Sequence, residues 1–161
     1  MTAVAVTGLG ALTPLGPDVA ALTEGLLSSR SGVRLLEGEQ WDALPARLAA
    51  TVDLEGRLER VEARTLDRVQ QVALVAAREA WDDAGQPAVE PERLAVVIGS
   101  GIGGALTLLA QNEVLQTKGP RSVSPHVVPM LMPNGPAATV GLALGARAGV
   151  HTPVSACASG A

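Results

Sequence analysis

The sequence contains little cysteine, little histidine and no excess of positive charge. Cys157 is the single cysteine and there are two histidines, so an internal disulfide framework is excluded and no metal-binding cluster is expected. The net charge of −4 argues against nucleic acid or an anionic membrane as a partner. The first residues, MTAVAVTG, have no basic lead, so we expect no signal peptide and a reducing, cytoplasmic location.

Charge is also missing from one long stretch near the end of the chain. Residues 122–146 contain no Asp, Glu, Lys or Arg, and the stretch is long enough to span a membrane. Four prolines, at positions 125, 129, 133 and 136, argue against a continuous apolar helix. We therefore expect no membrane segment here, and instead a region covered by further sequence, by a partner subunit or by both.

What is present is typical of one globular α/β domain. Apolar residues make up 47% of the 161 residues and charged residues 17%. The apolar patterns predict alternating strands and helices around a largely buried sheet. The predicted strands are Ala3–Thr7, Leu94–Ile98 and Val150–Ala156, and the predicted helices begin at Pro17, Thr65, Gly104 and Asn134.

Two regions carry more specific expectations. In the first helix, Val19, Leu22 and Leu26 form the stripe expected to face inward. Residues 33–63 are predicted to be irregular and polar, with Trp41 and Pro45 as anchors.

Cys157 is the candidate nucleophile. It follows an apolar run and precedes three small residues, Ala158, Ser159 and Gly160. A side chain at the turn from a buried strand into a helix meets unpaired N–H groups that favour the thiolate, and small neighbours leave room for a substrate carbonyl. A small, buried, inert cysteine is the alternative interpretation.

The chain offers Cys157 no convincing base. His151 lies six residues earlier on the same predicted strand, which separates the two Cα atoms by about 20 Å. His126 is expected in a loop, where a solvated or interface histidine is the simpler interpretation.

A glycine pattern after the second predicted strand resembles a dinucleotide fingerprint. Gly99, Gly101 and Gly104 have the G-x-G-x-x-G spacing, between a strand and a helix. A dinucleotide site also requires an acidic residue about twenty positions later, and no Asp or Glu follows Glu113. Close packing at glycine is therefore favoured over a nucleotide-binding module, and no cofactor is expected.

Several segments together resemble one family. VAVTGLGALTPLG, LDRVQQVALVAAREAWDDAG, VVIGSGIGG, RSVSPHVVPMLMPNGPAA and PVSACASGA resemble the N-terminal portion of the β-ketoacyl-acyl-carrier-protein synthases. These are condensing enzymes of type II fatty acid synthesis with a thiolase-like, layered α/β/α fold. The resemblance covers residues 1–161, so we expect an N-terminal synthase domain that stops just after its nucleophile.

The resemblance implies a reaction and a set of roles. Cys157 would accept an acyl chain from acyl carrier protein, its backbone N–H would be one oxyanion-hole donor, and malonyl carrier protein would then lose carbon dioxide and condense to a 3-oxoacyl product. Ile102 and Val127 match positions of the acyl pocket. The segment Ser124–Met132 matches one that packs across a homodimer.

The sequence also departs from the family. An aromatic residue usually stands where this chain has His126, and the chain has no Phe or Tyr. The family's two catalytic histidines and its lysine belong to a second half that these residues do not include. We therefore expect residues 1–161 to be less than half of a subunit and unable to condense on their own, although Cys157 could still be acylated slowly.

Two alternatives of the same fold stay open. One is a polyketide ketosynthase. The other is a non-catalytic, chain-length partner subunit, against which Cys157 counts, since such subunits generally lack the active-site cysteine.

Overall fold

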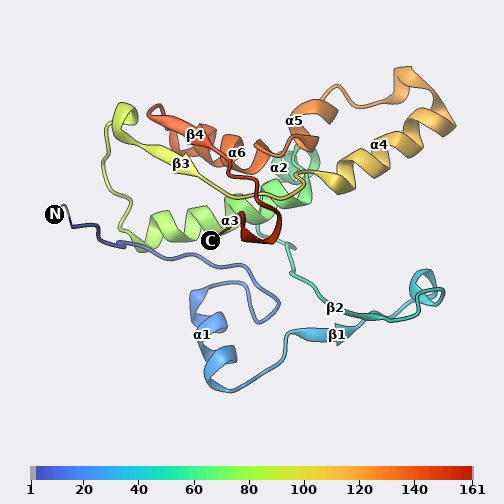
Figure 1. Cartoon of the computed structure of the whole chain (residues 1–161), viewed down its shortest axis with the longest axis horizontal. Coiled ribbons are helices and arrows are strands. Elements are labelled where there is room, and N and C mark those ends of the chain that lie inside the picture. The colour runs from blue at the N-terminus through green and yellow to red at the C-terminus, as the bar shows by residue number, and fades with distance from the viewer. Residues whose placement is uncertain (1–2, 161) are drawn as a thin grey trace.

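A computed structural model describes residues 3–160 (Figure 1). A pair of short parallel strands, β3 (Ala95–Val97) and β4 (Gly149–His151), lies against helix α6 (Gly135–Leu144), which in turn packs on helix α3 (Arg68–Asp83). The register pairs Val96 with Val150. The core of this part is Leu74, Val96, Ala137 and Val140, with the fully buried Pro136 beside them. Helix α6 can approach both the strands and α3 closely because most of its residues are small.

The connection between β3 and β4 contains two further helices. Helix α4 (Ala105–Lys118) runs away from the core, and the chain returns through the short helices η3 (Pro120–Ser122) and α5 (Val127–Leu131). The predicted bounds of α4 and α6 are confirmed to within a few residues. Gly119 and Gly145 end these helices with positive φ, a backbone conformation that glycine adopts without the steric cost of a Cβ.

The long helix predicted from Thr65 is α3 in the structure, and it begins at Arg68. A separate short helix precedes it, mostly within the segment that was predicted to be irregular. Helix α2 (Arg60–Thr65) ends before Asp67, whose extended backbone and side chain begin α3. The Asp67 carboxylate accepts a hydrogen bond from the Val69 N–H, and the Gln70 side chain accepts one from the Asp67 N–H. This reciprocal capping box sets the start of α3 just after Asp67, whereas the apolar periodicity alone placed it at Thr65.

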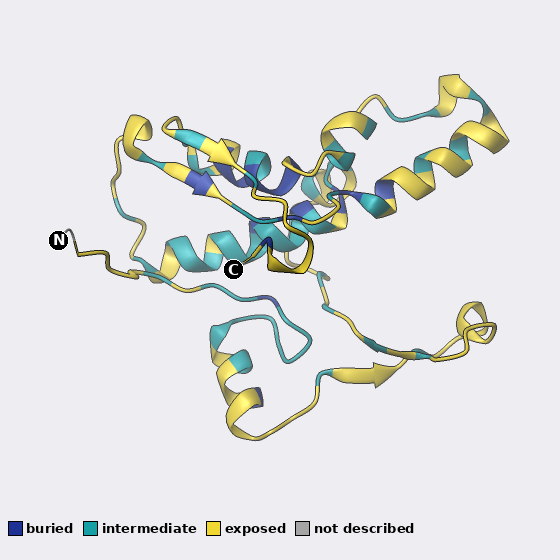
Figure 2. Cartoon of the chain, viewed as in Figure 1, coloured by how far each residue is buried: buried dark blue, intermediate teal, exposed yellow. Residues whose placement is uncertain are grey.

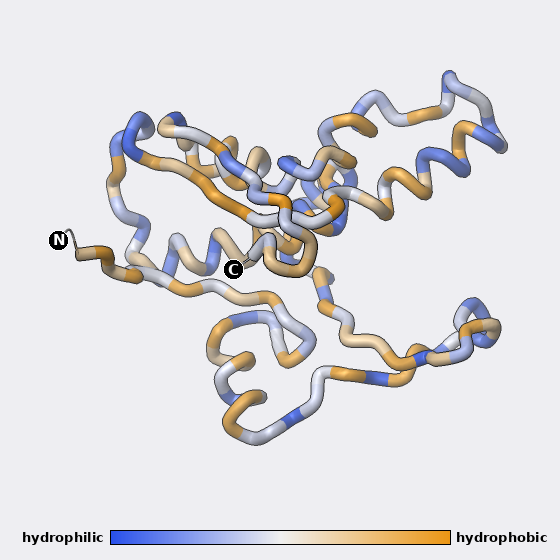
Figure 3. Tube along the Cα trace, in the orientation of Figure 1, coloured by the Kyte–Doolittle hydropathy of each residue, from blue (hydrophilic) through white to orange (hydrophobic). Residues whose placement is uncertain are grey.

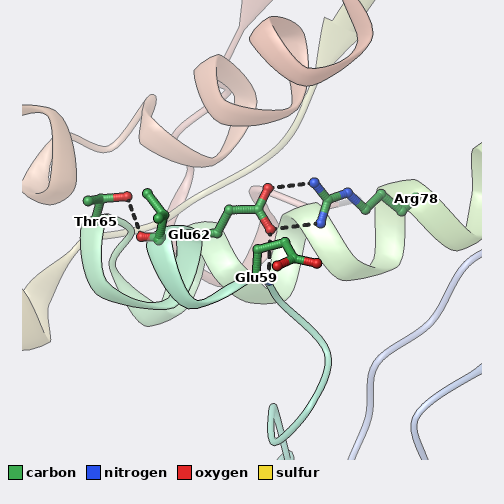
Figure 4. A network of polar contacts seen from close by, with 5 residues as sticks. Glu59, Glu62, Thr65 and Arg78 are labelled. Atoms are coloured by element: carbon green, nitrogen blue, oxygen red, sulfur yellow. Dashed lines mark hydrogen bonds and ion pairs between the residues drawn. The ribbon is translucent and has the colours of Figure 1, made fainter.

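One ion pair joins α2 to α3. The Arg78 guanidinium donates to both carboxylate oxygens of Glu62, at 2.6 and 3.1 Å (Figure 4). This hydrogen bonding holds the pKa of Glu62 below its usual value, and the Glu59 N–H bonded to the same carboxylate acts in the same direction. The pair fixes the short helix against the long one.

The N-terminal third is more loosely built than predicted. Helix α1 (Val19–Leu27) begins two residues later than predicted, because Asp18 is its N-cap and not a residue of its first turn, and Leu26 of the expected inward stripe is exposed. Residues 33–63 are not wholly irregular, because β1 (Val33–Leu35) and β2 (Leu48–Ala50) form an antiparallel hairpin with η1 (Glu39–Trp41) between them. The anchors predicted at Trp41 and Pro45 are wrong, since both side chains are exposed.

Two strand predictions also need correction. Ala3–Thr7 is not a buried strand: it runs extended with Val4 93% and Val6 81% exposed, although it is apolar (Figures 2 and 3). No strand pairs with it among residues 3–160, and a strand cannot be buried without a neighbour. The last strand is Gly149–His151 and not Val150–Ala156, because its partner β3 ends at Val97.

The described chain leaves much surface exposed. Its accessible surface is 11050 Å², whereas a compact monomer of this mass exposes about 7,500 Å². Apolar side chains contribute to the exposed area on α4, where Leu106, Leu108 and Leu109 are each more than half exposed. Among the helices of residues 3–160, none combines the length and the hydropathy that a membrane crossing requires.

Candidate active site

The parallel strands bring two loops together at one edge of the sheet. The glycine-rich loop follows β3, and the turn that carries Cys157 follows β4 (Figure 1). Because carboxyl ends of parallel strands meet at the same edge, the loops are neighbours. Their pairing continues past the strands: the Ile98 N–H donates to the His151 carbonyl at 3.1 Å and the Ser100 N–H to the Pro153 carbonyl at 3.4 Å.

Cys157 lies in a single turn of 3₁₀ helix, η4 (Ala156–Ala158), and its thiol is free and exposed. Ala156, immediately before it, has φ of +50°, a left-handed conformation that is strained for a residue with a Cβ. Cys157 therefore lies in a sharp turn, as predicted, but the strand expected to lead directly into that turn ends earlier, at His151. A longer helix after Cys157 stays a prediction, since the described turn ends at Gly160.

The strained turn is held by Ser159, which is 6% exposed. Its hydroxyl donates to the Ala156 carbonyl at 2.6 Å and accepts from the Ser155 N–H at 2.9 Å. Its own N–H also donates to the Ala156 carbonyl, at 3.1 Å. These bonds close the chain around Cys157 and satisfy buried polar groups that would otherwise cost free energy.

Gly99 supports the turn from the other loop. A Cβ placed on Gly99 would overlap the Ser159 carbonyl and lie 2.8 Å from the Gly160 nitrogen. Gly104 is equally restricted, because a Cβ there would overlap the Met130 carbonyl and lie 2.9 Å from the Leu131 Cα. Close packing against the chain itself therefore explains two of the three glycines of the G-x-G-x-x-G pattern. This is the explanation that the sequence favoured over nucleotide binding.

The residues predicted to line an acyl pocket flank this loop. Ile102 lies in the loop and is 75% exposed, and Val127 is the half-buried first residue of α5. The Gly104 N–H donates to the Leu131 carbonyl at 3.1 Å, which ties the loop to α5. Their roles as pocket residues stay predictions.

Neither histidine is hydrogen-bonded to Cys157 in the part of the chain that the structure describes. His151 is exposed at the end of β4, and its Nε2 lies against Gly149. His126 is exposed just before α5, and its backbone N–H donates to the Ser124 hydroxyl at 3.2 Å. Residues 3–160 contain no group of three or more His, Cys, Asp or Glu side chains that could hold a metal ion.

Sequence reasoning missed a buried polar network beside the loops. Asp67 and Gln70 are each 4% exposed, and Thr107 is 8% exposed. One Asp67 oxygen accepts from the Thr107 N–H at 2.9 Å and from the Thr107 hydroxyl at 2.6 Å. The Gln70 amide donates to the Thr139 hydroxyl at 3.0 Å and to the Pro129 carbonyl at 3.2 Å. The available signal was the capping pattern Asp67-x-x-Gln70.

Comparison with known proteins matches the whole chain to one family. A family model described as "Beta-ketoacyl synthase, N-terminal domain" matches residues 1–161. The 3-oxoacyl-[acyl-carrier-protein] synthase 2 of Mycobacterium tuberculosis is 41% identical over 163 residues, and that of Staphylococcus aureus is 40% identical over 162 residues. Each match covers 98% of this chain and 39% of the relative, so the chain spans well under half the length of these proteins.

Solved structures have the same fold. A β-ketoacyl synthase from Burkholderia phymatum superposes with a TM-score of 0.76 at 27% identity, over 99% of this chain and 41% of that one. The ketosynthase of a type II polyketide system, solved with its acyl carrier protein, gives a TM-score of 0.67 at 20% identity, over 88% of this chain and 40% of that one. The second likeness concerns the fold alone.

Proposed function

The chain belongs to the β-ketoacyl synthase family, whose N-terminal domain it matches over its full length, and from this we propose that Cys157 is the acyl-accepting nucleophile of a 3-oxoacyl-acyl-carrier-protein synthase of fatty acid biosynthesis. The observation that carries the proposal is the exposed thiol in a strained, internally bonded turn at the carboxyl edge of the sheet. A nucleophile that is exposed and positioned by its own backbone can attack a carbonyl carbon without a rearrangement of the turn.

The first step is a thioester exchange. The Cys157 thiolate attacks the carbonyl carbon of an acyl chain carried by acyl carrier protein, a new carbon–sulfur bond forms, and the bond to the carrier's sulfur breaks. The carrier's sulfur leaves as a thiolate and takes up a proton. The Cys157 N–H is a suitable donor to the intermediate oxyanion, since no hydrogen bond within the described chain uses it.

The second step needs groups beyond Cys157. Malonyl carrier protein loses carbon dioxide, the resulting carbanion attacks the acyl-cysteine carbonyl, and the Cys157 thiolate leaves. Neither His126 nor His151 is hydrogen-bonded to the thiol in the described chain, which supports the expectation that residues 1–161 alone are acylated slowly but do not condense.

The acyl chain would pass beside Ile102 and Val127. Both residues are apolar, they belong to the loop and helix joined by the Gly104–Leu131 hydrogen bond, and Ile102 is available for contact. An apolar chain gains free energy by covering such surface.

The proposal includes a homodimer in the cytoplasm. Support for the dimer comes from the large exposed surface and the exposed leucines of α4, which a second subunit could cover. Support for the compartment comes from the exposed thiol, which an oxidising environment would consume. Sedimentation equilibrium at micromolar concentration tests the dimer, and a monomer there would contradict it.

The test of the nucleophile is an acylation assay read by mass spectrometry. Incubation with palmitoyl acyl carrier protein should add one acyl group to the peptide that contains Cys157. Cys157→Ala should abolish the adduct, and Ser155→Ala, an exposed neighbour, should retain it. An adduct on another residue, or none on the wild-type protein, overturns the proposal.

A further inference from the structure

The carbonyl of Pro129, within α5, has no helical partner. An α-helix would satisfy it with the N–H four residues later, but that residue is Pro133, which has no N–H. The helix also ends first, since Met132 is extended and its N–H donates to Val128. Instead, the Gln70 amide reaches across from α3 and donates to the Pro129 carbonyl at 3.2 Å.

The orientation of the Gln70 amide is determined by its partners. The Pro129 carbonyl can only accept, so the amide nitrogen must face it, and the Asp67 N–H can only donate, so the amide oxygen must face that. The second amide hydrogen goes to the Thr139 hydroxyl on α6. A Cβ on Gly135 would lie 2.9 Å from the Gln70 nitrogen, so the side chain is also tightly packed.

Helix α5 depends on such external contacts. It has five residues, which is too short for a helix to persist by its own hydrogen bonds. One tie is the Gly104 N–H bonded to the Leu131 carbonyl, and the other is Gln70. Through Asp67, the same network is bonded to Thr107 in the first turn of α4.

We propose that Gln70 is a positioning residue that fixes α5, and with it Val127, and thereby sets the preferred length of the acyl chain transferred to Cys157. The inference rests on the proposed function. Gln70 does not touch the substrate; it acts through the Pro129 carbonyl. Loss of this bond lets α5 shift, which changes the apolar surface that Val127 offers to the acyl chain and leaves the thiol untouched.

The experiment compares acylation of Cys157 by hexanoyl and palmitoyl acyl carrier protein, in the wild-type protein and in Gln70→Met. Methionine has a similar volume and no amide. We expect the ratio of the two rates to change about fivefold, the size of effect that one net hydrogen bond supports. Alkylation of Cys157 by iodoacetamide should stay at the wild-type rate.

The matched control is Gln71→Met. Gln71 is the next residue on α3, and its amide donates to the Ala63 and Leu66 carbonyls of the α2 region instead of to α5. This variant also removes two amide hydrogen bonds from α3, and it should keep the wild-type rate ratio. If Gln70→Met does not fold, the same rate ratio is measured in Gln70→Asn. The shorter asparagine side chain keeps an amide but cannot bridge Asp67 and Pro129.

Three results bear on the inference. A changed ratio in the Gln70 variant with an unchanged ratio in the Gln71 variant supports it. An unchanged ratio in a folded Gln70 variant, or an equal change in both, overturns it and leaves Gln70 a purely structural residue. Failure of the wild-type protein to be acylated by either donor overturns the proposed function itself, which separates the two failures.

Discussion

The backbone of Gly99 lies against the backbone of Ser159, so closely that no side chain fits between them. The two residues are sixty positions apart and belong to the loops that follow β3 and β4. Ser159 in turn bonds the strained Ala156 that precedes Cys157. The position of the thiol is therefore determined by a glycine on the neighbouring loop.

Gly99→Ala should disturb this arrangement. The added Cβ would overlap the Ser159 carbonyl, a backbone atom that can move only with the turn. We expect a loss of about 1–3 kcal/mol in the free energy of unfolding, the usual cost of forced overpacking, and a clear fall in the rate at which iodoacetamide alkylates Cys157. Thermal unfolding and alkylation kinetics measure the two effects.

The control for this substitution is Gly101→Ala in the same loop. Its Cβ would lie 3.6 Å from the Ala156 carbonyl, an ordinary van der Waals distance. We expect near wild-type stability and alkylation. An equal loss of stability and of alkylation rate in both variants would show that the loop as a whole, and not the Gly99–Ser159 contact, is sensitive to an added side chain.

Ser159→Ala should loosen the turn from within. It removes the acceptor of the Ser155 N–H and one donor to the Ala156 carbonyl at a nearly buried site, which should cost about 1–3 kcal/mol of stability. The rate at which iodoacetamide alkylates Cys157 should also change, because the turn that holds the thiol is less rigid without these hydrogen bonds. Ser155→Ala, the same change at an exposed serine, should alter neither the stability nor the rate. A wild-type alkylation rate in the Ser159 variant would contradict this role of Ser159.

The sequence was informative where one local rule decides the structure. Helix α4 ends at Gly119 and α6 at Gly145 because glycine accepts the positive φ required there. The family and the α/β fold class were predicted and are confirmed. Cys157 lies in a sharp turn as predicted, although the strand before it ends at His151. A nucleophile flanked by small residues after an apolar run is likewise a local pattern.

The sequence was uninformative where the structure depends on a distant partner. The apolar run Ala3–Thr7 has the composition of a strand, but composition does not supply the neighbour with which a strand must pair. Asp67 and Gln70 look like solvated helix residues in the sequence and are buried because they satisfy one another and Thr107. The contact of Gly99 with Ser159 is a third case, visible only once β3 and β4 are paired.

Asp67→Asn should weaken the buried network. One Asp67 oxygen accepts two hydrogen bonds from Thr107, and an amide nitrogen in that place would face two donors. Leaving buried donors unsatisfied should cost about 1–3 kcal/mol, measured by chemical denaturation. Thr107→Ser keeps both donors and should cost about 1 kcal/mol or less, the value of a lost methyl group. Equal stability of Asp67→Asn and the wild type would show that the network contributes nothing.

The Glu62–Arg78 pair should make stability depend on pH in the acid range. Its hydrogen bonds hold the pKa of Glu62 below the ordinary value of about 4.3. A lowered pKa in the folded state means that the stabilisation is complete above the ordinary value and is lost as the pH falls through the folded one. We therefore expect the stability difference between the wild type and Glu62→Gln to be constant near neutral pH and to shrink below about pH 4.

The size of this difference should be modest, about 1 kcal/mol or less, because the pair is partly exposed to solvent. Glutamine retains an oxygen for the Glu59 N–H, so the variant removes the charge pair and keeps the helix cap. Glu92→Gln is the matched control: its pair with Arg147 is a single long contact, 3.4 Å, between two mostly exposed side chains. Urea denaturation at several pH values should show the acid-dependent difference in stability for the Glu62 variant alone. A difference that grew as the pH fell would show that the pKa of Glu62 is not lowered in the folded state.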